Sequence, residues 1–236
     1  MSAVRGLLVT ATDTEVGKTV VAAALTAALV ADGHEPRAYK PAVTGLDEPV
    51  DGVLADHELL ARVTGDDPAL VSPQRFGPAV SPHLGAQLAG TVLDPGALVA
   101  GARAQAARSP RDLVVVEGVG GLLVPLTPTW LVRDLAVELA LPVVVAARPA
   151  LGTINHTLLT LAAARDAGLD VRAVILTPWP AQPSTIEASN RETLEALAGC
   201  EVAVLPRLAA FDDATLAAAG AALSPARWIG AGAAAA

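Results

Sequence analysis

Cysteine, aromatic residues and positive charge are all scarce in this sequence of 236 residues. The one cysteine, Cys200, cannot form a disulfide within the chain, so a disulfide-stabilised fold is excluded. Aromatic residues make up 3% of the chain and hydrophobic residues 53%, so the core must be built from Ala, Val and Leu. Such a composition favours a parallel sheet that helices cover on both faces.

The charge balance and the lack of long apolar runs also exclude whole classes of protein. The formal net charge is -8 and no basic stripe is present, so neither nucleic acid nor an anionic membrane is an expected partner. No apolar run approaches the ~20 residues of a membrane-spanning helix without a charge or a proline. The first residues do not resemble a signal peptide. We therefore expect a soluble, cytoplasmic protein.

The stretch 7–19 begins as an apolar run and ends in a polar loop, Gly17-Lys18-Thr19, which an alanine-rich helical pattern follows. A nucleoside triphosphate site needs this order, because the loop N–H groups and the helix dipole converge on a phosphate. Lys18 can then neutralise the β- and γ-phosphates, and the Thr19 hydroxyl can bind Mg²⁺. The full pattern G-x-x-x-x-G-K-[ST] fails at its first glycine, where Thr12 stands. The prediction therefore depends on the strand before the loop and the helix after it.

Apolar runs alternate with helical patterns along the whole chain. Strands are expected at 7–10, 36–39, 113–116, 141–146, 171–177 and 201–205, and helices at 18–32, 54–63, 82–90, 95–108, 130–140, 153–167, 184–197 and 212–222. The proline-rich segment 66–81 is expected to be an irregular surface loop. This alternation predicts one α/β domain at 1–229, a three-layer P-loop NTPase-like fold with a mostly parallel central sheet flanked by helices. Residues 230–236 are expected to form a flexible, Ala-rich tail.

Two of the expected strands end in a charged residue. Lys40 follows the strand at 36–39, where Pro41 keeps it extended, and Glu117 closes the buried strand at 113–116. Open parallel sheets bind their ligands at the edge where the strands end. Lys40 could instead be an ordinary surface lysine and Glu117 a carboxylate on the rim. The glycines after Glu117 favour a close approach of the backbone to a ligand.

Residues near the same strand ends offer oxygen ligands for Mg²⁺. This ion takes one or two carboxylates together with hydroxyl, phosphate and water oxygens. Thr19 and Glu117 fit that set, and Asp56 is either a second carboxylate or a solvent-exposed residue at a helix start. Asp13 and Glu15 are unusual in a phosphate loop, because carboxylates repel phosphate. They favour a cationic or amine-bearing substrate nearby.

Four motifs together resemble those of the dethiobiotin synthetases. In chain order they are Thr12-Asp13-Thr14-Glu15-Val16-Gly17-Lys18-Thr19, Tyr39-Lys40-Pro41 with Thr44-Gly45, Val116-Glu117-Gly118-Val119-Gly120-Gly121, and Leu151-Gly152-Thr153-Ile154-Asn155-His156. The motifs come in the family's order and at its spacing, and they span most of the chain.

The resemblance implies a reaction that closes the ureido ring of biotin. The family converts 7,8-diaminononanoate (7,8-diaminopelargonate), CO₂ and ATP with Mg²⁺ into dethiobiotin, ADP and phosphate. The diamine forms a carbamate, whose oxygen attacks the γ-phosphate to give a carbamic–phosphoric mixed anhydride. The second amine then attacks the carbonyl and expels phosphate. In such a reaction the protein positions the reactants and stabilises charge.

The resemblance also assigns roles to the matching residues. Lys18 and Lys40 would be catalytic, and Thr19, Asp56 and Glu117 would bind Mg²⁺. The nucleotide site would comprise Asp13, Thr14, Glu15, Val16, Gly17, Lys18, Thr19, Val20, Glu117 and Thr177. The substrate site would comprise Thr14, Glu15, Lys40, Thr44, Gly118 and Gly121, with Thr153, Ile154 and Asn155 holding the substrate carboxylate across the interface of a homodimer.

Two departures from the family pattern concern the nucleotide. Ala11 replaces the family's usual first loop glycine, and Thr177 stands where many members carry an Asn that reads adenine. We hypothesise from this that the enzyme discriminates poorly between purine and pyrimidine triphosphates.

Two other functions have to be weighed against this one. A related P-loop ligase of the cobyrinate synthetase type usually continues into a glutamine-hydrolysing domain with a nucleophilic cysteine, and Cys200 lies in no such motif. A partner-switching ATPase of the ParA/MinD type has a signature lysine early in the loop, and residues 11–16 contain none.

Overall fold

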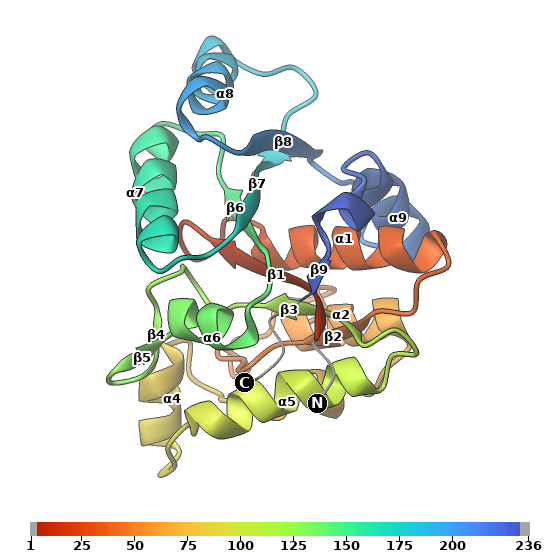
Figure 1. The fold of residues 1–236 in the computed structure, drawn as a ribbon, viewed down its shortest axis with the longest axis vertical. Coiled ribbons are helices and arrows are strands. Elements are labelled where there is room, and N and C mark those ends of the chain that lie inside the picture. The colour runs from red at the N-terminus through yellow and green to blue at the C-terminus, as the bar shows by residue number, and fades with distance from the viewer. Residues whose placement is uncertain (1–3, 232–236) are drawn as a thin grey trace.

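The computed structural model describes residues 4–231 and shows a layered α/β fold (Figure 1). Within these residues the central sheet has seven strands, in the order β2-β3-β1-β6-β7-β8, with β9 also paired to β1. The strands are β1 (Arg5–Ala11), β2 (Arg37–Tyr39), β3 (Leu113–Glu117), β6 (Val143–Ala147), β7 (Val171–Trp179), β8 (Glu201–Pro206) and β9 (Gly230–Ala231). All neighbours run parallel except β9, which is antiparallel to β1. The expected mostly parallel sheet is therefore confirmed.

Helices cover both faces of this sheet and make two separate hydrophobic cores. One face carries α1 (Lys18–Ala31), α2 (Asp56–Thr64), α3 (Pro68–Val71), α9 (Asp213–Ala221) and the 3-10 helix η1 (Pro225–Trp228). The other carries α4 (Pro82–Leu88), α5 (Pro95–Ala107), α6 (Val132–Leu139), α7 (Thr153–Asp166) and α8 (Thr185–Leu197). None of the described helices is long and apolar enough to cross a membrane.

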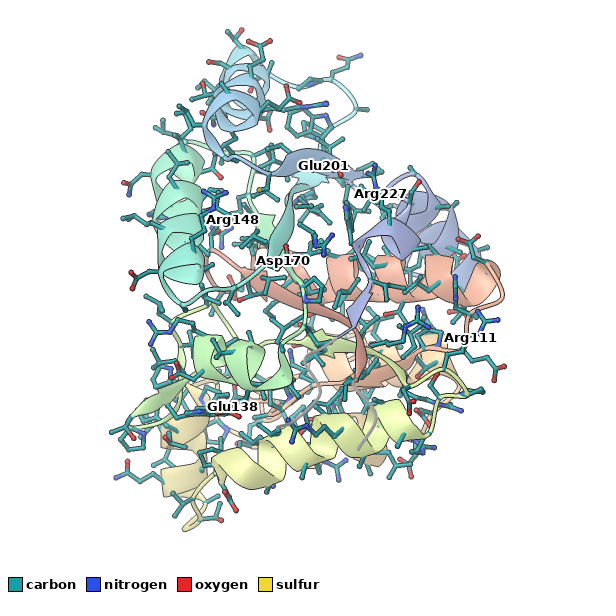
Figure 2. The ribbon with its side chains drawn as sticks, viewed as in Figure 1. Arg111, Glu138, Arg148, Asp170, Glu201 and Arg227 are labelled. Carbon is teal, nitrogen blue, oxygen red and sulfur yellow. The ribbon has the colours of Figure 1, made fainter. Side chains whose placement is uncertain are left out.

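Small residues let α1 and α9 lie against each other, as Figure 1 shows. A Cβ added at Gly220 would lie 1.9 Å from the carbonyl oxygen of Ala24, so a larger residue cannot fit there. At the end of the chain, Arg227 of η1 pairs with Glu201 at the start of β8 (Figure 2). The segment after β8 is thus fixed to the helix that begins at the Gly17-Lys18-Thr19 loop.

Three segments differ from the expectations. The segment 66–81 contains α3, because Pro68 stands in its first turn and the Asp67 carboxylate accepts a hydrogen bond from the Ala69 N–H at 2.8 Å. The helix expected at 130–140 begins only at Val132, because Trp130–Leu131 forms β5, which pairs with β4 (Pro125–Thr127). Of the tail expected at 230–236, the first two residues form β9, and 232–236 lie outside the described residues.

Candidate active site

The loop between β1 and α1 lies at the edge where the parallel strands end. Gly17 precedes the helix with a φ of 89°, and Glu15 has a φ of 55°, a left-handed conformation that is uncommon outside glycine. The first intrahelical bond runs from the Val21 N–H to the Gly17 carbonyl at 3.0 Å, so the N–H groups before Val21 have no acceptor within the helix. These groups and the positive end of the helix dipole are available to an anion.

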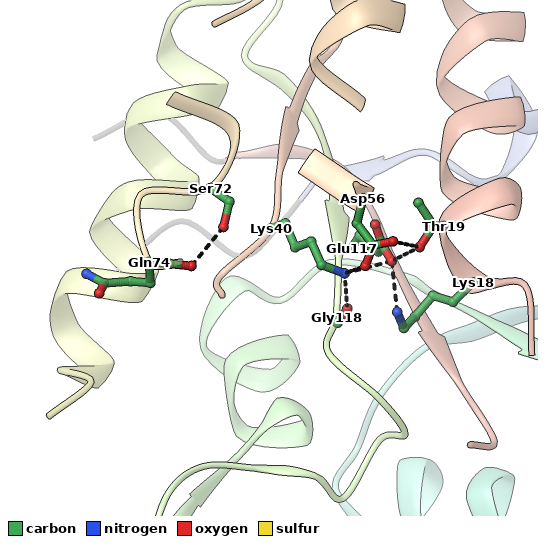
Figure 3. Close-up of polar contacts among 8 residues, drawn as sticks. All are labelled: Lys18, Thr19, Lys40, Asp56, Ser72, Gln74, Glu117 and Gly118. Carbon is green, nitrogen blue, oxygen red and sulfur yellow. Dashed lines mark hydrogen bonds and ion pairs between the residues drawn. The ribbon is translucent and has the colours of Figure 1, made fainter. Parts of the chain in front are cut away.

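Two lysines, two carboxylates and a threonine meet beside this loop (Figure 3). Glu117 Oε1 accepts from Lys18 Nζ at 2.8 Å and from Lys40 Nζ at 2.9 Å. Lys40 Nζ also lies 2.8 Å from Asp56 Oδ2. The Thr19 hydroxyl lies 2.8 Å from both Asp56 Oδ1 and Glu117 Oε1. The predicted catalytic and metal-binding residues are therefore one connected cluster.

Each member of the cluster comes from the end of a different element. Glu117 is the last residue of β3, Lys40 directly follows β2, Asp56 begins α2, and Lys18 and Thr19 begin α1. The two strands are neighbours, because Tyr39 pairs with Val116 in the sheet. The Lys40 backbone is fixed by its N–H, which donates to the Val71 carbonyl at 2.8 Å. Parallel order thus brings together residues that are up to 99 positions apart in sequence.

Burial and the opposite charges determine how these groups ionise. Burial works against the charge on Lys40, but Asp56 and Glu117 outweigh it and raise the Lys40 pKa, so this ammonium stays charged at neutral pH. Burial also dominates at Lys18, whose pKa is lowered because Glu117 compensates only in part and Lys40 repels it. For Asp56, burial would raise the pKa, but Lys40 and Lys18 hold it well below its usual value. Lys40 and Asp56 thus form an ion pair at neutral pH.

The oxygen atoms of this cluster fit a divalent cation. The Thr19 hydroxyl has one proton for two carboxylate oxygens at 2.8 Å, and Glu117 Oε2 is buried with no hydrogen-bond partner. Glu117 Oε2 can therefore accept a further contact, and a hydroxyl with one or two carboxylates is the protein share of an Mg²⁺ site. Within residues 4–231 no group of three or more His, Cys, Asp and Glu side chains lies together as a metal site.

A cavity of about 1200 Å³ opens over the loop and the charged cluster. Half of the residues predicted to bind nucleotide, metal or substrate line it: Thr14, Glu15, Gly17, Lys18, Thr19, Val20, Lys40, Thr44 and Asp56. Glu117 lies beneath them, with 0% of its side chain exposed. The structure therefore brings these predicted residues to one place.

Other predicted residues lie outside this cavity. Asp13 is exposed and its carboxylate accepts from the Thr14 N–H at 2.8 Å, whereas Val16 is buried in the core. Thr177 is also buried, and its side chain faces Gly17, where an added Cβ would lie 3.1 Å from the Thr177 methyl carbon. The three residues Thr153, Ile154 and Asn155 form the first turn of α7.

The glycines after Glu117 lie close to other segments of the protein. A Cβ at Gly118 would lie 2.9 Å from a Val132 methyl carbon, and a Cβ at Gly121 would lie 3.4 Å from the Ala11 carbonyl oxygen. Gly120, between them, lines the cavity. The expected need for a small residue is present at Gly118, where packing against Val132 supplies the reason, whereas the distance at Gly121 is an ordinary van der Waals contact.

The sequence predictions missed several residues at the cavity. Arg62 of α2 and Phe211, which follows β8, both line it. Arg148, which follows β6 and is labelled in Figure 2, does not line the cavity but donates to the Thr14 carbonyl at 2.9 Å and so holds the loop. Phe211 and Arg148 follow strand ends, so the rule that selected Lys40 and Glu117 would have found their segments.

The fold is that of a large class of nucleotide-binding proteins. The MinD protein of Pyrococcus horikoshii, solved with Mg-ADP, has a TM-score of 0.55 to this chain at 15% identity, covering 93% of this chain and 96% of that one. The MinC:MinD complex of Aquifex aeolicus gives a TM-score of 0.56 at 11% identity, covering 93% and 95%. A family model described as an AAA domain matches residues 5–215. Together with the Gly17-Lys18-Thr19 loop, this fold defines a P-loop nucleoside triphosphatase.

Within that class, curated ATP-dependent dethiobiotin synthetases match most of the sequence. The one from Anaeromyxobacter sp. (strain Fw109-5) is 46% identical over 73% of this chain and 76% of its own length, and the one from Mycobacterium avium (strain 104) is 42% identical over 86% and 88%. The chain therefore belongs to the dethiobiotin synthetase family and is an ATP-dependent ligase of biotin biosynthesis.

Proposed function

We propose that the protein closes the ureido ring of dethiobiotin from 7,8-diaminononanoate, CO₂ and ATP, with release of ADP and phosphate. The carbamate of the diamine attacks the γ-phosphate, and the second amine then displaces phosphate from the mixed anhydride. The observation that carries the proposal is the cluster in which Lys18 and Lys40 share Glu117 Oε1, at 2.8 and 2.9 Å, on the floor of the cavity.

The two lysines supply charge in different ways. Lys18, at the first helical position, donates to the β- and γ-phosphates, as a lysine after a phosphate loop does. Lys40 lies 2.8 Å from Asp56 and 2.9 Å from Glu117, and it acts as a positive charge beside the carbamate and the migrating phosphoryl group. Its contacts with Asp56 and Glu117 hold the ammonium in place before the substrates arrive.

We propose that Thr19, Asp56 and Glu117 hold Mg²⁺, because they bring a hydroxyl and two carboxylates together and Glu117 Oε2 has no hydrogen-bond partner. When bound, this ion neutralises phosphate charge and makes the γ-phosphorus a better electrophile. Asp56 is half-exposed, with 42% of its side chain accessible, so it can exchange the Lys40 ammonium for another cation. Glu117 remains buried below and keeps Lys18 and Lys40 oriented.

The diamine belongs on the side of the cavity formed by Thr44, Gly120 and the segment 79–82. Thr14 and Glu15 belong to the phosphate loop and also line the cavity, and an added Cβ at Gly120 would lie 3.4 Å from the Thr14 methyl carbon, so the Glu15 carboxylate can attract an ammonium group there. Thr153, Ile154 and Asn155 lie away from this cavity, so their proposed role requires a homodimer in which each copy completes its partner's site. We also propose that the enzyme is cytoplasmic.

Phosphate release tests this proposal against an ATP-driven switch. Purified protein with Mg²⁺, ATP and bicarbonate should release phosphate only when the diamine is added, and dethiobiotin should form in equal amount. Phosphate release that does not depend on the diamine would favour the switch. The similarity to MinD is a similarity of fold and carries no argument for such a switch.

A further inference from the structure

The cavity extends beyond the charged cluster to the segment that joins β8 to α9. Ala209, Ala210 and Phe211 of this segment line the cavity, and so do Val20 of α1 and Arg62 of α2. This end lies on the α1–α9 side of the molecule, whereas Thr44 and Gly120 belong to the loops after β2 and β3. A triphosphate bound at Gly17–Thr19 therefore has room for its nucleoside toward Phe211.

Phe211 is an exposed aromatic residue in a chain that has few. The chain contains two phenylalanines, and 41% of Phe211 is accessible, whereas Phe76 is buried. The residue after it is fixed, because the Asp212 carboxylate caps α9 by accepting from the Thr215 N–H at 2.9 Å and from its hydroxyl at 2.7 Å. Phe211 thus presents an aromatic ring from a well-anchored backbone at the cavity wall.

Arg62 holds the same segment from the opposite side. Its guanidinium donates to the Phe211 carbonyl oxygen and pairs with Asp213 Oδ1 at 3.1 Å. Arg62 lies six residues after Asp56 on α2, so one helix carries both a carboxylate proposed to bind metal and the contact that fixes the Phe211 backbone. The position of the ring is therefore coupled to the phosphate end of the site.

We infer that Phe211 is the surface on which the base of the nucleoside triphosphate stacks, and that Arg62 is the positioning residue that holds it there. The inference rests on the proposed use of a nucleoside triphosphate. Every base has a flat π face, so stacking on an aromatic ring accepts purines and pyrimidines alike. Thr177 is buried against Gly17 and does not line the cavity, so it offers no polar contact to the base. The site then recognises the triphosphate strongly and the base weakly.

Binding of three probes with Mg²⁺ tests the role of Phe211: ATP, CTP and inorganic tripolyphosphate, which has no base. Phe211→Ala should raise the Kd for ATP about tenfold, because stacking on an aromatic residue contributes about 1–3 kcal/mol per base. The Kd for tripolyphosphate should stay unchanged. Phe211→Tyr, which keeps the ring, should bind ATP as the wild type does. Ile186→Ala on α8 removes a side chain of similar exposure, 53%, away from the cavity and is the matched control.

The same probes separate the role of Arg62 from a direct phosphate contact. Arg62→Ala should raise the Kd for ATP about threefold and leave the Kd for tripolyphosphate unchanged, because only the stacking surface is loosened. Equal weakening of ATP and tripolyphosphate in Phe211→Ala, or an unchanged Kd for ATP, would overturn the inference. Loss of tripolyphosphate binding in Arg62→Ala would overturn the positioning role. A wild type that binds neither ATP nor tripolyphosphate would instead overturn the proposed function.

Discussion

The contact between Tyr39 and Gly101 connects the core to the active site. Tyr39 is the last residue of β2 and directly precedes Lys40, and 1% of it is exposed. Its hydroxyl is buried with no hydrogen-bond partner, and burial raises its pKa, so it stays protonated. A Cβ added at Gly101 of α5 would lie 2.6 Å from the Tyr39 hydroxyl oxygen and 3.0 Å from two ring carbons. Substitution at either residue therefore changes how the other fits.

These distances give the sign and size of each effect. Tyr39→Phe should raise the free energy of unfolding by about 1 kcal/mol, because an unsatisfied buried polar group costs about 1–3 kcal/mol. Gly101→Ala should lower it by about 2 kcal/mol, since overpacking of about 3 kcal/mol exceeds a helix-propensity gain of about 1 kcal/mol. The double variant loses the shortest contact and keeps those at 3.0 Å. Its free energy of unfolding should be about 1 kcal/mol higher than the value obtained by adding the effects of the two single substitutions.

Urea unfolding of the wild type, both single variants and the double variant measures this coupling. Gly96→Ala on the same helix is the control, because an added Cβ there meets only an Asp94 oxygen, at 3.4 Å. It should leave the free energy of unfolding within about 1 kcal/mol of the wild type. The kcat should follow the same pattern, falling in Gly101→Ala and recovering in the double variant, because a displaced Tyr39 moves Lys40. Additivity within about 0.5 kcal/mol, or a Gly101→Ala variant as stable as the wild type, would refute the reasoning.

Three further predictions concern the charged cluster. Lys40→Ala should lower kcat about a hundredfold with the circular dichroism spectrum unchanged, as removal of one charge-stabilising donor does elsewhere, and a near-normal kcat would exclude Lys40 from catalysis. Glu117→Gln should raise the Mg²⁺ concentration for half-maximal activity about tenfold, and an unchanged Mg²⁺ dependence would make Glu117 a structural residue. The Asp56 pKa is lowered in the folded state, so its stabilisation is present above the unfolded pKa and is lost as acid protonates it. Urea midpoints of the wild type should fall from about pH 4 downward, and those of Asp56→Asn should fall less; equal slopes would contradict the pairing with Lys40.

Periodicity predicted most of the sheet and helices, because buried parallel strands are continuous apolar runs. Leu113–Val116 shows no polar residue, and the structure buries this strand completely. The pairing of Trp130–Leu131 with β4 could not be predicted in the same way, because a two-residue strand has no period and its partner lies in a loop. The antiparallel β9 is equally short, and its pairing with β1 depends on a chain end that sequence patterns treat as unstructured.

The candidate site could be predicted as far as strand ends reveal it. Open parallel sheets bind ligands where their strands end, and this rule identified Lys40, Glu117 and Thr19, which follow apolar runs. It could not identify Asp56, because Asp56 does not end a strand. For Asp56 the sequence alone left a surface role open; its 2.8 Å contacts with Lys40 and Thr19 make it part of the cluster, and its role as a metal ligand stays a prediction. Arg62 could not be found from sequence, because its role depends on the distance between α2 and the segment after β8.

The alanine at position 11, where the family usually has its first loop glycine, has a local explanation in the sheet. Ala11 is the last residue of β1 and pairs with Ala146 of β6, so it needs extended backbone and not a left-handed turn. The positive φ angles come later, at Glu15 and Gly17, after the chain has left the strand. The Ala11 carbonyl accepts from the Leu122 N–H at 3.2 Å, which joins this strand end to the glycine-rich segment after β3. An alanine is therefore compatible with phosphate binding here, since the turn that aims the N–H groups depends on Gly17 and not on position 11.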